Sequence, residues 1–156
     1  MASPVVAPVA SAAGSTAVDA QPPSVDTAAS AAVAAFACPE AEERLLDANR
    51  LHVYHVALEL HCLCSTLVAT LNRIVKDQLE RASLSIVLNV AEAAGRRSRR
   101  DKARFYAIAR GSATETAALL DVLAMRRLAS PAAIRTGRRL AVRIVQMLTR
   151  IDQRLV

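Results

Sequence analysis

The sequence predicts an all-α protein, an antiparallel up-down-up-down bundle of four helices. Over most of residues 40–156, apolar residues recur at spacings of three and four, the period of a helix with one buried face. Alanine, leucine, valine and isoleucine supply the apolar content, whereas aromatic residues make up only 3% and tryptophan is absent. This composition suits close-packed helices. Short connections with capping residues favour antiparallel neighbours.

Residues 1–38 differ in composition from the rest of the chain. They are rich in Ala, Val, Pro and Ser, contain four of the six prolines, and show no sustained helical period. We expect a disordered tail here, whose role the sequence does not reveal, followed by the bundle over residues 39–156.

The first two helices are predicted over residues 40–71 and 77–94. Pro39 is accepted at the first helical position, and acidic residues follow in the opening turns. Asp77, with Glu80 three positions later, predicts the cap of the second helix, although the segment before it has neither Gly nor Pro. The expected buried stripes are Val53, Val56, Leu60, Leu63, Leu67 and Ile74, and then Leu79, Ala82, Ile86, Asn89 and Ala93.

The third and fourth helices are predicted over residues 99–128 and 131–155. Gly95 is expected to end the second helix in a left-handed conformation, and Ser98 to cap the third. Ser130 and Pro131 cap and open the fourth. The expected buried stripes are Phe105, Ile108, Ser112, Glu115, Leu119 and Val122, and then Ile134, Gly137, Ala141, Ile144, Leu148, Ile151 and Leu155.

Additional apolar residues lie off these stripes. The apolar stripes are therefore broader than the core of a single bundle requires. This predicts self-association. The residues concerned are Leu58, Val87, Leu88, Leu120, Leu140, Val145 and Met147.

Polar residues fall on the expected stripes of the second and third helices. Buried polar groups are costly unless they are paired, so we expect these side chains to satisfy one another, with Gly111 allowing a close backbone approach. The carboxylates could instead form an acid–base pair, but no nucleophile–base pattern or glycine-rich phosphate loop accompanies them. The prediction is therefore a structural layer, with no catalytic residue and no cofactor. Its members are Ser85, Asn89, Glu92, Ser112 and Glu115.

Positive charge is concentrated after the tail. Residues 1–39 carry two acidic and no basic residues, so residues 40–156 hold all 20 basic residues against 12 acidic ones, a net charge of +8. Eighteen of the 20 are arginines, whose planar side chains suit phosphate. The densest group surrounds the connection between the second and third helices, with Asp101 its one acidic neighbour. It comprises Arg96, Arg97, Arg99, Arg100, Lys102 and Arg104.

This group predicts a surface that contacts the phosphates of RNA or DNA. The other interpretation is a solvated helix start that only aids solubility. Few aromatic residues lie nearby, so binding would depend on the backbone, with weak sequence specificity and a steep dependence on salt. A second basic surface on the fourth helix is a further hypothesis. Its members are Arg135, Arg138, Arg139 and Arg143.

The remaining features of the sequence argue against a metal-binding, a disulfide-stabilised or a membrane-spanning protein. His52, His55, Glu59 and Cys62 share one helical face, but one straight helix rarely supplies enough zinc ligands, so we predict no metal site. Three cysteines without framework spacing indicate reduced thiols. No uncharged run reaches the length of a membrane helix, and no signal peptide is recognisable, so we expect a soluble cytoplasmic protein.

The stretch over roughly residues 46–125 resembles the four-helix-bundle family encoded in intervening sequences of bacterial 23S rRNA genes. A relative of that family is the accessory variability determinant of diversity-generating retroelements. Ala93 departs from the pattern, since glycine usually follows Ala-Glu in the family. The matching residues are Val53-Tyr54, Ala57-Leu58, Gln78-Leu79, Arg81-Ala82, Ser85-Ile86, Asn89-Val90-Ala91-Glu92, Gly95-Arg96, Ser98, Asp101, Arg104-Phe105, Ile108-Ala109, Gly111-Ser112 and Glu115.

The resemblance implies a closed ring of five bundles with a basic surface, nucleic-acid binding and no enzymatic activity. For the retroelement branch it also implies a reverse transcriptase as partner. We therefore expect a homo-oligomer, a pentamer by resemblance, that binds RNA or DNA and does not bind a membrane. The alternative is a homo-oligomeric scaffold that binds a protein partner and has no nucleic-acid role of its own.

Overall fold

The computed structural model describes residues 46–67 and 73–155. These residues form a short 3-10 helix η1 (Asp47–Arg50) and the α-helices α2 (His52–Leu67), α3 (Arg73–Gly95), α4 (Arg99–Met125) and α5 (Pro131–Leu155), with no strand among them. The predicted tail, the opening turns of the first predicted helix and its last residues at 68–71 lie outside the described residues.

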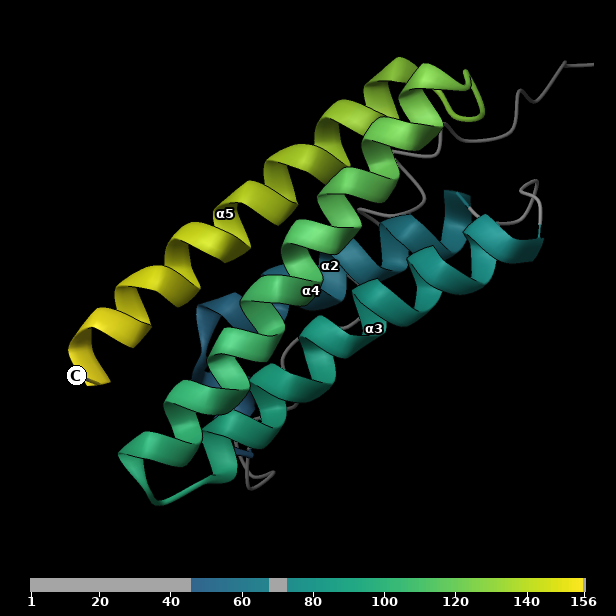
Figure 1. Cartoon of the computed structure of the whole chain (residues 1–156). Coiled ribbons are helices and arrows are strands. Elements are labelled where there is room, and N and C mark those ends of the chain that lie inside the picture. The colour runs from purple at the N-terminus through teal and green to yellow at the C-terminus, as the bar shows by residue number, and fades with distance from the viewer. Residues whose placement is uncertain (1–45, 68–72, 156) are drawn as a thin grey trace, which may run out of the picture.

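The four α-helices form a bundle. Each helix packs against its neighbours in sequence, and α5 also packs against α2, so that the helices close around a common core. Along the chain, α3, α4 and α5 alternate in direction (Figure 1). The predicted all-α four-helix bundle is therefore confirmed. None of the helices described here is both long and apolar enough to span a membrane.

Two helix starts differ from prediction. Leu46 and Leu51 are extended on either side of η1, so α2 begins at His52 and no single helix runs on from residue 40. Ala48 of η1 is buried, and η1 packs against α2 and α3. The predicted cap at Asp77 is wrong, because α3 already begins at Arg73 and places Asp77 inside the helix.

Serine caps begin the last two α-helices as predicted. Ser98 Oγ accepts a hydrogen bond from the Asp101 amide at 3.4 Å, and Ser130 Oγ accepts one from the Ala133 amide at 3.2 Å. Gly95 does not take the predicted left-handed conformation. Arg127 does, with a φ of 53°, and ends α4 earlier than predicted.

The core is largely the predicted one in α2, α3 and α5, but not in α4. The buried side of α4 is rotated by about one residue, or ~100°, from the predicted stripe. Ile108, Glu115 and Val122 are exposed as a result. Both stripes have helical spacing, and the one that is buried carries smaller side chains on average and no carboxylate. It consists of Tyr106, Ala109, Ala113, Thr116, Leu120 and Leu123.

Most of the supposedly surplus apolar residues belong to the core. Val87, Leu120 and Leu140 are buried. Leu58, Val145 and Met147 are half-buried and pack against the core. Leu88 alone of that set is exposed, at 58%. Leu84 of α3 is exposed as well, and the rotation of α4 exposes two further apolar residues; we call the four together the apolar strip. It comprises Leu84 and Leu88 of α3 with Ile108 and Val122 of α4.

Candidate nucleic-acid interface

The basic residues predicted from the sequence gather at the tip of the bundle where α3 turns into α4. We refer to Arg96, Arg97, Arg99, Arg100, Lys102 and Arg104 as the turn cluster. Ser98 caps α4 within it, which leaves the first amides of that helix pointing toward the same end. A helix N-terminus carries a partial positive charge, so the cap and the side chains act in the same direction.

Arg96 differs from the other members of the turn cluster. Its guanidinium pairs with Glu92, one turn earlier on α3. The same group lies over the ring of Phe105 of α4, 5.1 Å from the centroid, a cation–π geometry. Arg96 therefore ties α3 to α4 at the turn, and its charge is largely used within the protein.

Four arginines of the turn cluster project freely. Arg97, Arg99, Arg100 and Arg104 are all exposed, and within the described part of the chain no carboxylate forms an ion pair with any of them. Lys102 is half-buried. The local field of these arginines is consequently balanced by few acidic groups.

Aromatic side chains offer little for stacking against bases. Tyr106 is buried, and burial raises its pKa. Phe105 lies beneath Arg96, and the half-buried Tyr54 of α2 makes a T-shaped contact with the ring of His55. Single-stranded nucleic acids are usually held by stacking on exposed aromatic rings. The geometry therefore suits phosphate contacts better than base contacts.

The predicted polar layer is only partly assembled. Ser85 and Ser112 hydrogen-bond across α3 and α4 at 2.9 Å, and the Asn89 amide donates to the Ser85 carbonyl at 2.8 Å. Glu92 and Glu115 do not join them, because both are exposed and Glu92 pairs with Arg96. Gly111 faces open space, so it does not serve a close backbone approach. The layer lies at the outer edge of the α3–α4 contact rather than in the core.

The structure contains a second polar group that was not predicted from the sequence. His61 of α2 lies with its Nδ1 2.9 Å from Ser83 Oγ of α3. The Ser83 hydroxyl donates to the Glu80 carbonyl at 3.1 Å, so it accepts a hydrogen bond from His61. Burial lowers the pKa of His61, and the nearby Glu80 opposes that shift. The partners are 22 residues apart on different helices, and no sequence spacing could have brought them together.

This histidine–serine pair does not make a nucleophile. Ser83 is fully buried, and its proton points to a backbone carbonyl rather than to an imidazole nitrogen. A serine nucleophile requires the reverse arrangement, with histidine accepting the proton and substrate reaching the oxygen. The adjacent Cys64 is also buried; burial raises its pKa to about 12, and the hydrogen bond with Ser83 only partly opposes this. A thiol in that state is unreactive.

The histidines of the first predicted helix are used in hydrogen bonds. His55 Nε2 lies 2.7 Å from the Asn49 carbonyl, and His52 Nε2 accepts from Arg143 of α5 at 2.6 Å. Over residues 46–67 and 73–155, no three His, Cys, Asp or Glu side chains come together as a metal site. His52 therefore serves to join α2 to α5.

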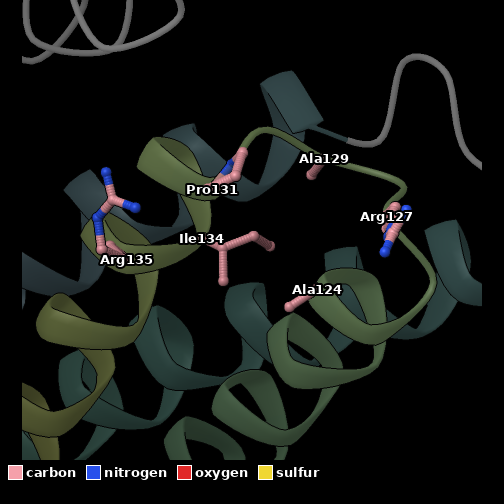
Figure 2. Close-up of a pocket in the computed structure, with 6 residues that line it drawn as sticks. All are labelled: Ala124, Arg127, Ala129, Pro131, Ile134 and Arg135. Carbon is pink, nitrogen blue, oxygen red and sulfur yellow. The ribbon is translucent and has the colours of Figure 1, made fainter.

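An open hollow of about 630 Å³ lies beside the α4–α5 connection. Figure 2 shows Ile134 between Ala124 and Pro131, with Arg127 and Arg135 on opposite sides. Its lining is apolar except for these two exposed arginines, so it presents no pair of groups for acid–base chemistry. The lining residues are Ala124, Arg127, Ala129, Pro131, Ile134 and Arg135.

Comparison with known proteins shows the family to which the chain belongs. The family model of the 23S rRNA-intervening sequence protein matches residues 49–150, which include the turn cluster and nearly all four α-helices. The chain belongs to this family. No curated protein matches it significantly. For this family member, the solved structures include one of the same fold.

That structure is of a protein of unknown function from the S23 ribosomal protein family of Bacteroides thetaiotaomicron. It superposes with a TM-score of 0.62 at 24% sequence identity, over 65% of this chain and 98% of that one. At this identity the likeness supports the fold and carries no statement about ligands.

Proposed function

We propose that this 23S rRNA intervening sequence family member is a non-enzymatic accessory protein that binds RNA or DNA through the turn cluster. One observation carries the proposal: four arginines project from one tip of the bundle, and among the described residues no carboxylate pairs with them. Phosphate contacts of this kind give binding that depends on the nucleic-acid backbone, has weak sequence specificity and weakens with salt.

Replacement of Arg97, Arg99 and Arg100 by Gln tests this function. Arg96 is left in place because it ties α3 to α4. Binding to labelled RNA and DNA is followed by fluorescence anisotropy over a series of salt concentrations. Removal of one phosphate-binding arginine reduces the slope of log K against log salt by about one, and for the triple variant we expect a fall in affinity of roughly tenfold or more at low salt.

A matched control removes the same charge elsewhere. Arg73, Arg81 and Arg126 are exposed and lie away from the turn, and their replacement by Gln also lowers the formal net charge from +6 to +3. This control is expected to change the slope much less. Equal effects of the two triple variants, or an unchanged slope in the turn variant, would reject the turn cluster as the binding surface.

A homo-oligomeric scaffold that binds a protein, such as a reverse transcriptase, is the second candidate function. The exposed apolar strip favours it, since large exposed apolar groups commonly mark protein interfaces. Size-exclusion chromatography with light scattering and the ratio of absorbance at about 260 and 280 nm separates the two. Salt-removable nucleic acid in the peak supports the first function, whereas a protein partner retained at high salt supports the second.

A further inference from the structure

Five arginines follow the outer side of α5. With 3.6 residues per turn, they fall within a sector of about 100°, and all five are exposed. The buried side of the helix, which includes Ile134, Ala141 and Ile144, lies opposite. In Figure 1 α5 forms one edge of the bundle, with α2 and α4 as the helices packed against it. We call the group the α5 stripe: Arg135, Arg139, Arg143, Arg150 and Arg154.

The α5 stripe keeps most of its charge unpaired. Asp152 is the single acidic residue of α5, and it pairs with Arg110 of α4 at 3.6 Å. Arg143 donates a hydrogen bond to Nε2 of His52, and no carboxylate of the described residues forms an ion pair with it. For the other four arginines, no partner carboxylate exists among the residues that the structure describes.

The α5 stripe is long and straight, and it lies on a helix without aromatic residues. Nineteen residue steps separate Arg135 from Arg154, which corresponds to about 29 Å along the helix axis. This is slightly less than one turn of a B-form duplex, ~34 Å. The sequence of α5 contains no Phe, Tyr, Trp or His. A flexible single strand would find no ring on which to stack, whereas a duplex presents a stiff row of phosphates.

We propose that the α5 stripe is a second nucleic-acid contact and that its ligand is double-stranded. This inference rests on the proposed function, which gives nucleic acid as the class of ligand. It adds a separate binding surface and specifies that the nucleic acid is double-stranded. The chemistry shared by RNA and DNA duplexes, a regular double-stranded phosphate backbone, defines the ligand. The turn cluster at the tip then contacts the same duplex or a neighbouring strand.

The test compares four labelled probes of one sequence: an RNA duplex, the matching DNA duplex and one single strand of each. Duplexes of about 20 base pairs exceed the ~16 that a double-stranded RNA-binding domain spans. The α5 variant carries Arg135→Gln, Arg139→Gln and Arg150→Gln, which spares Arg143 and its bond to His52. Replacement of the same three residues by Lys keeps the charge and provides the matched control.

We expect the wild-type protein to bind duplexes roughly tenfold tighter than single strands, in line with several additional phosphates bound. The α5 Gln variant should lose that preference and about three units of salt slope on duplexes, while the Lys variant retains most of both. A difference in affinity between the RNA and DNA duplexes would show which of the two the protein prefers.

Failure of this inference and failure of the proposed function give different results. Equal wild-type affinity for duplexes and single strands, or a Gln variant that binds duplexes like the wild type, overturns the inference alone. Binding that still depends on Arg97, Arg99 and Arg100 would then leave the proposed function intact. No binding to any probe overturns both. Circular dichroism of each variant confirms that these exposed replacements leave the helices folded.

Discussion

At the scale of single residues, buried polar groups of this bundle are satisfied within a few positions of themselves. Ser83 donates to the Glu80 carbonyl at 3.1 Å, and Thr116 donates to the Ser112 carbonyl at 2.8 Å. In the described residues, every buried side-chain nitrogen or oxygen has a hydrogen-bond partner. These local bonds allow small hydroxyl groups to enter a helical core without the penalty of an unpaired donor.

His61 makes folding sensitive to pH. Since burial lowers its pKa, the unfolded chain binds a proton more readily than the folded protein. Stability is therefore complete above the ordinary value of 6.5 and falls as the pH drops below it, until the folded state is protonated as well.

The variant His61→Asn removes the titrating group and keeps an amide donor for Ser83. Between about pH 7.5 and about pH 5.5, we expect the wild-type protein to lose more thermal stability than this variant. Thermal unfolding followed by circular dichroism at the two pH values makes the comparison. An equal loss in both proteins would show that His61 does not contribute to the pH dependence.

At the scale of elements, the two connections between the last three α-helices reverse the chain in different ways. After Gly95, the Arg96 amide bonds to the Ala93 carbonyl at 3.3 Å, a tight closing turn that needs no left-handed residue. After Met125, the Leu128 amide reaches back to the Leu123 carbonyl at 3.0 Å, a bond that forms when the intervening residue is left-handed. Arg127 is that residue.

Arg127→Gly should stabilise the protein. A non-glycine residue in the left-handed region costs about 1 kcal/mol, and glycine removes that cost. Chemical denaturation should show a gain of about this size in the free energy of unfolding. Arg126→Gly is the control, because Arg126 has ordinary helical angles and gains nothing from glycine. A gain in the control equal to that at Arg127 would contradict the argument from backbone conformation.

At the scale of the whole molecule, the rotation of α4 decides which surfaces remain exposed. The apolar strip belongs to the same two helices that the Ser85–Ser112 hydrogen bond joins, and that bond pairs both hydroxyl groups. Burial of such a surface against another copy would leave few polar groups unpaired. We propose self-association through this face; a ring of five is the stoichiometry that the family resemblance implies.

Leu88→Gln combined with Ile108→Gln should weaken that association. Size-exclusion chromatography with light scattering is expected to show an oligomer for the wild type and a shift toward the monomer for the double variant, because apolar burial drives such contacts. Val142→Gln on α5 provides a control of similar exposure, 46% against 43% for Ile108. A wild-type protein that is monomeric over the accessible concentration range would rule out this interface.

The sequence alone determined the features that depend on neighbouring residues. Helical periodicity predicted four helices, Ser98 and Ser130 marked two helix starts, and the arginines around residue 100 were necessarily brought together by one short turn. The residues from Asn89 to Glu115 also carried the resemblance to the family that the comparisons confirm. These properties depend on residues close together in the chain, so they can be predicted from the sequence alone.

The tertiary structure decided which side of α4 is buried and which side chains of different helices meet. Two helical stripes of α4 competed for the core, and packing against α3 and α5 selected the one without Glu115. The same packing withdrew Arg96 toward Glu92 and Phe105, paired His61 with Ser83, and brought Arg143 to His52 across 91 positions of the sequence. Helical spacing fixes which residues share a face, and where two faces of one helix are both partly apolar, as in α4, only contacts with the other helices fix which face is buried.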